Sequence, residues 1–229
     1  MRDEIVSYRE MCDREGEQTL QRGMNHCLNP GYSVVLMSRR ANAPYRDRVL
    51  EDGQTIEYEG HDAARSGEEP NPKGVDQPRF LPTGKPTQNG LFADAVEAIR
   101  LRHKAPDLVR VYEKIFSGVW SDKGFFLLTD YKYVSDGERN VFKFYLKAME
   151  GSPGGAESKY APSSSRLIPS EVKKEVWKRD KGKCVLCGAQ ENLHFDHDIP
   201  WSKGGASITT ENVRILCARH NIEKRDRIE

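Results

Sequence analysis

Apolar residues recur with two different spacings along the first part of the chain. Residues 32–38, YSVVLMS, are apolar and β-branched, and residues 55–60, TIEYEG, alternate before a glycine, so both predict strands. Residues 91–104, LFADAVEAIRLRHK, have the spacing of an amphipathic helix, which Pro106 stops. We also expect residues 3–20 to form a short helix. The pattern predicts strands combined with one long helix.

Three further apolar segments complete this region. Residues 108–115, 124–136 and 140–148 predict strands, and the SDGER sequence between the last two predicts a hairpin. Residues 68–90 contain five prolines and no periodicity, which predicts a long irregular loop. We therefore expect a mostly β domain with one good helix.

A change in composition divides the chain. Residues 151–169, GSPGGAESKYAPSSSRLIP, are rich in Gly, Ser and Pro and predict a linker. After it, residues 170–180 predict a helix with Ser170 at its N-cap, and a last helix is expected from about Ala218. The expected division is a domain over residues 1–150, a linker over 151–169 and a domain over 170–229.

Composition restricts the class of protein. The 229 residues have a hydrophobic fraction of 37% and a mean hydropathy of −0.74, and no apolar run approaches the roughly 18 residues that span a bilayer. The N-terminus is charged throughout and does not resemble a signal or transit peptide. We therefore expect a cytoplasmic protein that uses no membrane. Net charge is only +1, from 36 basic and 35 acidic residues, so local clusters must indicate any nucleic-acid partner.

The cysteines predict a metal site. Five cysteines suit a reducing compartment better than a disulfide framework. Two pairs, each separated by two residues, offer four soft ligands that can converge on zinc: Cys184, Cys187, Cys217 and His220. Because the region is too small to fold on apolar burial alone, the zinc is expected to be structural. Cys12 and Cys27 are interpreted as ordinary small residues.

The residues between these pairs resemble a known family. HFDHDIPWSKGG (194–205) and ENVRILCARHN (211–221) resemble the HNH nuclease motif of the ββα-metal type, in its zinc-stabilised subclass. The resemblance implies that His197 is the general base and that Asp196 and Asn221 hold a catalytic divalent cation, Mg²⁺ or Mn²⁺, with Co²⁺ and Ni²⁺ as alternatives. Asn212 would support the loop that orients His197. Asn221 stands where the motif often has histidine.

The chemistry of phosphodiester hydrolysis suits these residue types. A neutral imidazole can take a proton from water at working pH, and a hard cation held by a carboxylate and an amide oxygen can neutralise charge on the phosphate. Neighbouring strand residues point to opposite faces, so Asp196 and His197 share one site only if the backbone bends there. His194 is interpreted as a supporting or purely structural residue.

Basic residues gather around this motif. A basic rim suits a nuclease because phosphate contacts supply affinity that does not depend on sequence, although each residue is alternatively part of a solvated face. The members are Lys203, Arg214, Arg219, Lys224, Arg225 and Arg227.

The N-terminal region resembles a second family. GYSVVLMSRRANAPYRDRVLEDGQTIEYEGHD (31–62) is similar to the opening of an SRA (YDG-type) domain, although the late Tyr-Asp-Gly signature is absent. SRA domains flip a modified cytosine out of the duplex, which requires aromatic faces and an acceptor for the exocyclic amine. The resemblance implies that Tyr45 and Tyr58 stack on the base and that Asp47 reads its edge. Each is alternatively an ordinary core or sheet residue.

Basic and polar residues on two loops are further candidates for DNA contact. Arg39, Arg40 and Asn42 follow the first strand and are expected to touch phosphate or to fill the gap left by the flipped base. Lys73, Arg79 and Lys85 on the proline-rich loop are candidates for the opposite groove.

Together these resemblances predict an α+β protein. An SRA-like curved β-sheet or β-barrel domain with flanking helices would precede a small zinc-stabilised ββα-metal domain. The implied class is an SRA–HNH modification-dependent restriction endonuclease that acts on double-stranded DNA carrying 5-methylcytosine or 5-hydroxymethylcytosine. One such site cuts one strand, so we expect a homodimer, and no small-molecule substrate. The alternatives are a non-cutting reader of modified DNA and an HNH nicking enzyme for unmodified DNA.

Overall fold

The structure is a computed structural model, which describes residues 3–20, 23–28, 31–40, 42–64, 71–102, 104–149, 167–199 and 209–224. Its contacts divide it into two compact units, one of residues 1–18, 111–125 and 149–229, the other of residues 19–110 and 126–148. Strands β6 (Leu108–Phe116) and β7 (Val119–Ser135) contribute residues to both units. The expected boundaries at residues 150 and 170 stay predictions.

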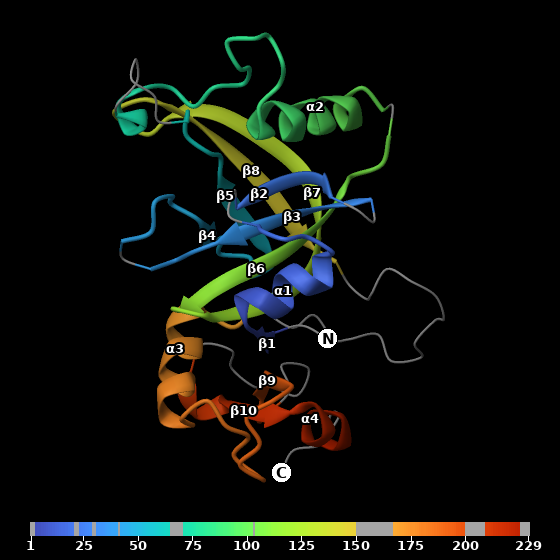
Figure 1. The fold of residues 1–229 in the computed structure, drawn as a ribbon, viewed down its shortest axis with the longest axis vertical. Coiled ribbons are helices and arrows are strands. Elements are labelled where there is room, and N and C mark those ends of the chain that lie inside the picture. The colour runs from blue at the N-terminus through green and yellow to red at the C-terminus, as the bar shows by residue number, and fades with distance from the viewer. Residues whose placement is uncertain are drawn as a thin grey trace. The chain divides into compact units, whose positions relative to one another are not determined.

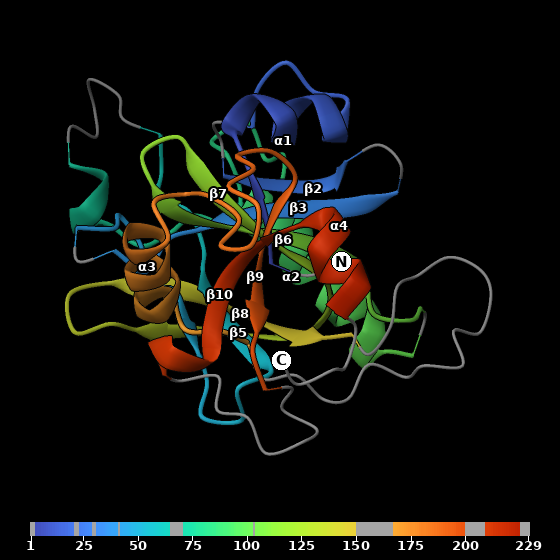
Figure 2. The same ribbon diagram turned by 90° about the horizontal axis from the view of Figure 1, so that it is seen from below.

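In the first unit, strands from both ends of the chain form one ladder. The middle strand, β1 (Glu4–Val6), pairs antiparallel with the first residues of β7 on one side and with β9 (Leu193–His197) on the other. Strand β9 then pairs with β10 (Val213–Cys217), which runs directly into helix α4 (Ala218–Lys224). The two strands and the helix lie side by side (Figures 1 and 2) and give the ββα order that the resemblance implies.

Helix α3 (Ser170–Arg179) covers this small sheet. Its Val172 and Val176 pack with Phe195 and Ile215 of the two strands in one apolar core. Pro169, and not Ser170, is the N-cap residue of α3. Ser170 is instead the first helical residue, and its hydroxyl donates to the buried Glu113 carboxylate. The predicted helix at 170–180 is confirmed, but its predicted cap is wrong.

A cluster of buried charges lies beside this core. Lys173 of α3 pairs with Asp3 and lies 3.7 Å from the Glu113 carboxylate, which also pairs with Lys123 at 2.8 Å. Ser121 completes the cluster by accepting from Lys173 at 2.9 Å. Buried charges are tolerated only when they are paired, so two ammonium groups and two carboxylates balance here. Strand β1 and helix α3 are thereby fixed to β6 and β7.

The N-terminal segment differs from the prediction. Residues 3–20 are expected to form a helix, but only Tyr8–Glu15 is helical (α1), and strand β1 precedes it. Ser7 and Glu10 form a reciprocal capping box at the start of α1, and Gly16 ends it with φ 69°. Residues 4–6 are extended because strands on both sides supply their hydrogen-bond partners.

The second unit is built mainly of antiparallel strands. It contains the hairpin of β2 (Met24–Leu28) and β3 (Tyr32–Met37), and the short β4 (Arg48–Val49) beside β5 (Thr55–Glu59). Strand β5 pairs with β8 (Asn140–Ala148), and β8 forms the predicted hairpin with the last part of β7. The strands expected at 32–38, 55–60, 124–136 and 140–148 are therefore present, within a few residues.

Helix α2 (Gln88–Arg100) belongs to the same unit and confirms the predicted amphipathic helix. Thr87 caps it by accepting from the N–H of Gly90. The irregular loop predicted at 68–90 ends earlier than expected, because its last three residues belong to α2. Its other described residues contain the short 3-10 turn η1 (Pro72–Gly74) and an isolated bridge. The α+β fold class is confirmed. Residues 151–166 of the expected linker lie outside the described residues. No described helix is long and apolar enough to span a bilayer.

Candidate functional site

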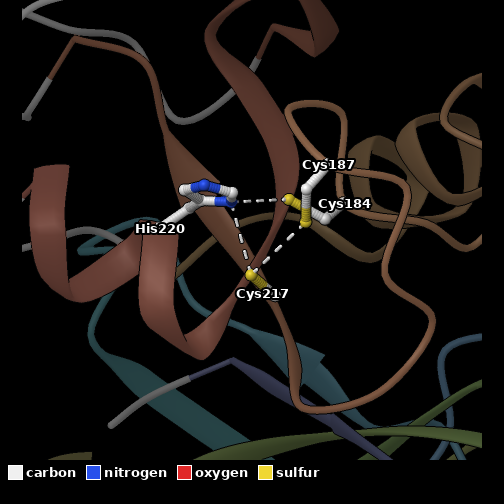
Figure 3. A group of neighbouring side chains, drawn as sticks. All are labelled: Cys184, Cys187, Cys217 and His220. Atoms are coloured by element: carbon white, nitrogen blue, oxygen red, sulfur yellow. Dashed lines mark hydrogen bonds between the residues drawn. The ribbon is translucent and has the colours of Figure 1, made fainter.

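Four predicted metal ligands converge in the first unit. Figure 3 shows the sulfurs of Cys184, Cys187 and Cys217 and the His220 ring directed toward one another. Nδ1 of His220 lies 3.3 Å from the Cys184 sulfur and 3.4 Å from the Cys217 sulfur, and the Cys187 and Cys217 sulfurs are 3.9 Å apart. All four ligand atoms lie within 4.8 Å of one another. We call these four residues the thiol–histidine frame.

The spacing of the thiol–histidine frame suits a tetrahedral ion. Zinc bonds of about 2.3 Å to sulfur and 2.0–2.1 Å to nitrogen put two sulfurs about 3.8 Å apart, and a sulfur and a nitrogen about 3.6 Å apart. Burial alone would raise the pKa of the Cys184 thiol, but backbone N–H groups and His220 lower it to about 6. Thiolate is the form that binds metal. The frame therefore fits a thiophilic divalent cation.

Local backbone geometry builds the frame. The first two cysteines lie on a tight turn in which the N–H of Gly188 donates to the carbonyl of Cys184 at 2.8 Å, with Gly188 at φ 74°. The N–H of Val185 donates to the carbonyl of Ile215 and ties this turn to β10. Cys217 ends β10, and His220 follows on the first turn of α4. A strand-to-helix junction thus brings the second pair of ligands to the first.

Asp196 and His197 occupy the end of strand β9. The strand pairs regularly with β10 up to His197, where Val213 lies opposite, while Arg214 lies opposite Asp196. Regular pairing puts consecutive side chains on opposite faces of the strand. The bend expected between these two residues is therefore not found, because the strand ends only after His197. The two groups are nevertheless close enough for the charge of Asp196 to act on the His197 ring, so a shared site does not depend on that bend. Pro200 and Gly204–Gly205 lie outside the described residues.

A buried lysine connects these two residues to α4. Nζ of Lys224, which is 2% exposed, donates to Oδ2 of Asp196 at 2.5 Å and also to the carbonyl of His197. Lys224 was expected on a solvent-facing basic rim, so that interpretation is wrong for this residue. Asn221 lies one turn earlier on α4, on the same helical side as Lys224.

The imidazole of His197 is kept in its basic form. Burial lowers the pKa of His197, with the charges of Lys224 and Lys173 acting in the same direction, and those of Asp3 and Asp196 opposing them. The net direction favours a neutral ring at neutral pH, which is the state that a general base requires.

Asn212 holds the segment after β9 in place. Its Oδ1 accepts from the N–H of Ile199 at 2.7 Å, its Nδ2 donates to the Ile199 carbonyl at 3.0 Å, and its own carbonyl accepts from the N–H of Asp198. Asn212 is buried at the end of the short 3-10 turn η3 (Thr210–Asn212). These contacts fix the backbone immediately after His197.

His194 is a buried histidine on strand β9. It is 3% exposed, and no described residue bonds its Nδ1. Burial lowers its pKa, so the ring is neutral at neutral pH. It lies two residues before Asp196 on β9 and therefore on the same face of the strand.

The remaining basic candidates of this region fall into two groups. Arg214 pairs with Asp198 at 2.7 Å, so its guanidinium already has a carboxylate partner. Arg219 contacts the His220 ring at 3.2 Å. Lys203, Arg225 and Arg227 lie outside the described residues.

Tyr45 in the second unit lies against a histidine. The rings of Tyr45 and His61 are stacked, with centroids 4.7 Å apart and planes 4° apart. Tyr58 is buried, and its hydroxyl contacts Nε2 of His61 at 2.9 Å and the Gly23 carbonyl at 3.0 Å. Burial lowers the pKa of His61 to about 4, so the ring is neutral at neutral pH.

Asp47 is committed to the backbone around these rings. Its two oxygens accept the N–H groups of Ser38 and Glu59, each at 3.0 Å, and the residue is buried. Burial raises the pKa of the Asp47 carboxyl to about 7, against the lowering effect of these two donors. Each carboxylate oxygen has a second lone pair, so both can accept one further bond.

His61 and Asp62 are residues that the sequence reasoning passed over. The carboxylate of Asp62 pairs with Arg139 at 2.5 Å and with Lys73 at 2.9 Å, and Lys73 also lies over the Tyr45 ring at 4.3 Å. A signal was present, because the two residues directly follow the predicted strand, in the sequence YEGHD that begins at Tyr58. We call Tyr45, Asp47, Tyr58, His61 and Asp62 the Tyr45 cluster.

The candidate DNA-contacting residues of the second unit differ in exposure and in the protein partners that they already bind. Arg79 is held by Glu97 and Asp94, at 2.8 and 2.6 Å. Arg40 is exposed and donates to Ser38 at 3.2 Å. Asn42 and Lys85 are exposed and Arg39 is half-buried.

One family model matches the chain. Residues 184–227 match the HNH endonuclease family, a span that contains the thiol–histidine frame, Asp196, His197, Asn212 and Asn221. The chain therefore carries an HNH endonuclease region, and the predicted class of enzyme, a phosphodiester hydrolase, is confirmed. No curated protein matches the chain.

Solved structures offer more distant likenesses. The SRA domain of SUVH5 in complex with methylated CHH DNA aligns with 65% of this chain and 88% of its own, at 21% identity and a TM-score of 0.42. The same domain bound to fully hydroxymethylated CG DNA aligns with 66% of this chain and 93% of its own, at 20% identity and a TM-score of 0.43. ScoMcrA, a phosphorothioation-dependent restriction endonuclease, aligns with 99% of this chain and 59% of its own, at 16% identity and a TM-score of 0.42.

Proposed function

We propose that the protein is a modification-dependent restriction endonuclease. Its HNH region would cut double-stranded DNA, and the region around the Tyr45 cluster would recognise 5-methylcytosine or 5-hydroxymethylcytosine by base flipping. The proposed cleavage activity rests on the HNH match over 184–227, a span that contains β9, β10, α4 and the thiol–histidine frame. The proposed recognition of modified cytosine rests on the sequence resemblance of residues 31–62 and on the stacked rings of Tyr45 and His61.

In the proposed reaction, His197 takes a proton from the attacking water. Its neutral state, favoured by burial, leaves a ring nitrogen free of a proton at neutral pH. Asn212 serves as a positioning residue because it fixes the backbone that follows His197. Loss of either contribution would slow cleavage without removing DNA affinity.

Asp196 and Asn221 are the proposed ligands of a catalytic divalent cation, Mg²⁺ or Mn²⁺, with Co²⁺ and Ni²⁺ as alternatives. A carboxylate and an amide oxygen are hard ligands that suit such ions, and the ion would neutralise charge on the phosphate and on the leaving oxygen. Lys224 anchors the Asp196 carboxylate to α4, the helix that also carries Asn221. That link supports the convergence of the two ligands.

The thiol–histidine frame would hold a structural zinc ion. Its four ligands complete a tetrahedral shell, which leaves no open position for a substrate. The apolar core around it is small, so metal binding and folding of the region are expected to be coupled.

Base recognition would use the Tyr45 cluster. An extruded cytosine would stack on an aromatic ring, and the ring of His61 against Tyr45 marks a face suited to a planar partner. Tyr58 is buried, so its proposed role is to set the position of His61 through its hydroxyl. Asp47 stays the proposed reader of the exocyclic amine, through a second lone pair on an oxygen.

Cleavage of both strands would need two active sites or two successive nicks, since one HNH site cuts one strand. We therefore propose a homodimer on DNA. Arg39, Arg40 and Asn42 are proposed to contact the DNA beside the Tyr45 cluster, and Arg214, Lys203 and Arg225 beside the HNH site.

A plasmid comparison tests the proposal. One plasmid sequence is prepared unmodified, 5-methylated, 5-hydroxymethylated and phosphorothioated, and each form is incubated with the full chain and Mg²⁺ or Mn²⁺. We expect double-strand cleavage of the cytosine-modified forms only, with His197→Ala inactive on all four.

The other outcomes identify the alternatives. Equal cutting or nicking of all forms would indicate an HNH enzyme without modification dependence, and cleavage of the phosphorothioated form alone would move recognition to the backbone. Selective binding with no cleavage would indicate a reader. A Tyr45→Ala variant locates the recognition: it should lose the preference for modified DNA while its HNH site stays intact.

A further inference from the structure

A second group of metal-ligating side chains lies in the second unit, apart from every residue assigned above. His26 and Cys27 are neighbours on β2, and Asp107 directly precedes β6. Nε2 of His26 lies 3.6 Å from the Cys27 sulfur and 3.6 Å from Oδ2 of Asp107. The three ligand atoms lie within 4.8 Å of one another. One ring nitrogen thus faces a thiol and a carboxylate together.

These separations match the edges of a tetrahedral coordination shell. Typical zinc bond lengths put a nitrogen and a sulfur about 3.6 Å apart, and a nitrogen and an oxygen about 3.4 Å apart. The thiol–histidine frame shows comparable nitrogen–sulfur separations of 3.3 and 3.4 Å. A direct hydrogen bond between a ring nitrogen and a carboxylate would bring the two atoms to about 2.8 Å. The longer distance from His26 to Asp107 leaves room for an ion between them.

The local backbone presents these ligands from a distorted strand. The pairing of β2 with β3 shifts register between Asn25 and Leu28, and Cys27 adopts φ 47° within the shift. A non-glycine residue in this left-handed region costs about 1–2 kcal/mol, so surrounding contacts must hold it there. The N–H of Cys27 donates to Ser33 at 3.1 Å, which is one such contact.

The other two ligands are also held in place. The N–H of His26 donates to the side chain of Gln88 at 2.7 Å, and the His26 ring packs edge-on against Phe92 with centroids 5.3 Å apart. Lys104 contacts both oxygens of Asp107, at 2.7 and 2.8 Å. Ligands of protein-bound metals are commonly oriented by such outer contacts. The Lys104 charge is a competing cation, and it can keep Oδ1 while Oδ2 binds a metal.

We propose that His26, Cys27 and Asp107 form a second metal site, for a thiophilic divalent cation of the zinc class. Three protein ligands of mixed nitrogen, sulfur and oxygen type leave the fourth tetrahedral position for solvent or for another ligand. The exposed Cys27 places that position toward the outside. The ion would connect β2 to the residues before β6, two segments far apart in the sequence. The site is independent of the proposed nuclease function.

Metal counting on the full chain tests the site. Wild type, Cys27→Ser and Cys12→Ala proteins are saturated with Zn²⁺, freed of excess ion by gel filtration and assayed by mass spectrometry of the metal. Cys12→Ala is the matched control, because it removes a thiol that belongs to neither ligand group. We expect about one zinc ion fewer per chain in Cys27→Ser than in wild type and Cys12→Ala. Equal contents in all three proteins would overturn the site.

Alkylation of Cys27 supplies a readout that does not depend on counting ions. Iodoacetamide modification is followed residue by residue by peptide mass spectrometry, with and without Zn²⁺. We expect Zn²⁺ to slow modification of Cys27 by at least about tenfold, since a metal-bound thiolate is shielded from the reagent. In His26→Gln this protection should disappear while the thiols of the frame stay protected. A Cys27 rate that Zn²⁺ leaves unchanged in wild type would contradict the proposal.

Discussion

The thiol–histidine frame and the Tyr45 cluster are built by different means. The frame draws its four ligands from two short segments, and their atoms face a common centre (Figure 3). The Tyr45 cluster draws on a loop, a strand end and, through Arg139, a hairpin distant in sequence. Its polar atoms bond one another and the backbone instead of a common point.

This difference determines how each region should respond to change. An ion gathers its ligands into one cooperative bond set, so removal of one ligand affects the whole region. A network of hydrogen bonds and stacked rings distributes its free energy over many contacts, so a single change should have a smaller effect.

Cys184→Ala should have the largest effect. Loss of one thiolate opens the shell around the ion, and structural zinc contributes about 10–16 kcal/mol to folding in small zinc domains. We expect the variant to lose one metal ion and the folded state of residues 170–224, as measured by metal content and by limited proteolysis. Cys12→Ala should keep both. A folded, metal-free, active Cys184→Ala protein would show that the frame does not depend on its ion.

His197→Ala should remove catalysis and leave the frame intact. Removal of a general base typically costs about 10²- to 10⁴-fold in rate. Plasmid cleavage should fall by this factor, while DNA affinity and metal content stay at wild-type values. A variant that loses its metal would mean that His197 supports the frame and not the chemistry.

Lys173→Met tests whether the stability of the region around the frame also depends on the buried charges beside it. The change leaves Asp3 without its ammonium partner, and breaking a buried pair costs about 3–5 kcal/mol. Urea denaturation should show this loss of unfolding free energy. The adjacent Lys174→Met is the matched control, because its partner Glu171 is exposed and such pairs are worth about 1 kcal/mol or less. Similar losses of unfolding free energy in both variants would show that the buried pair contributes no more to stability than the exposed pair.

His61→Gln tests the Tyr45 cluster through pH. The pKa of His61 is about 4 in the folded protein, below its usual 6.5, so the unfolded state takes up a proton first as the pH falls. The stability that depends on neutral His61 is therefore complete above pH 6.5 and is lost as the pH falls toward 4. The loss should be on the order of 3 kcal/mol. Urea denaturation at pH 7 and pH 4.5 should give a smaller difference for His61→Gln than for wild type; equal differences would exclude this role.

Sequence reasoning succeeded where spacing along the chain determines geometry. The two pairs of ligands lie at fixed short intervals, so their convergence followed from the spacing alone. Helix α2 and the β7–β8 hairpin were predicted for the same reason, since their apolar periods are local.

Long-range partners account for what the sequence did not reveal. Residues 4–6 were read as helix because nothing near them in sequence indicates pairing with β7 and β9. Nothing in the sequence distinguishes Lys224 from the other basic residues around it, because its burial depends on a contact with Asp196, which lies on another segment. His61 was passed over because its significance comes from Tyr45, on another segment.

The position of β1 between β7 and β9 has a consequence for folding. Glu4 pairs with His194, a residue far away in the sequence. Closing so long a loop costs chain entropy before the contact can repay it, so such pairing is slow to form. Until it forms, one edge of β1 stays unpaired, and an open strand edge invites association with other chains. The ladder that carries Asp196 and His197 is therefore expected to be completed late in folding.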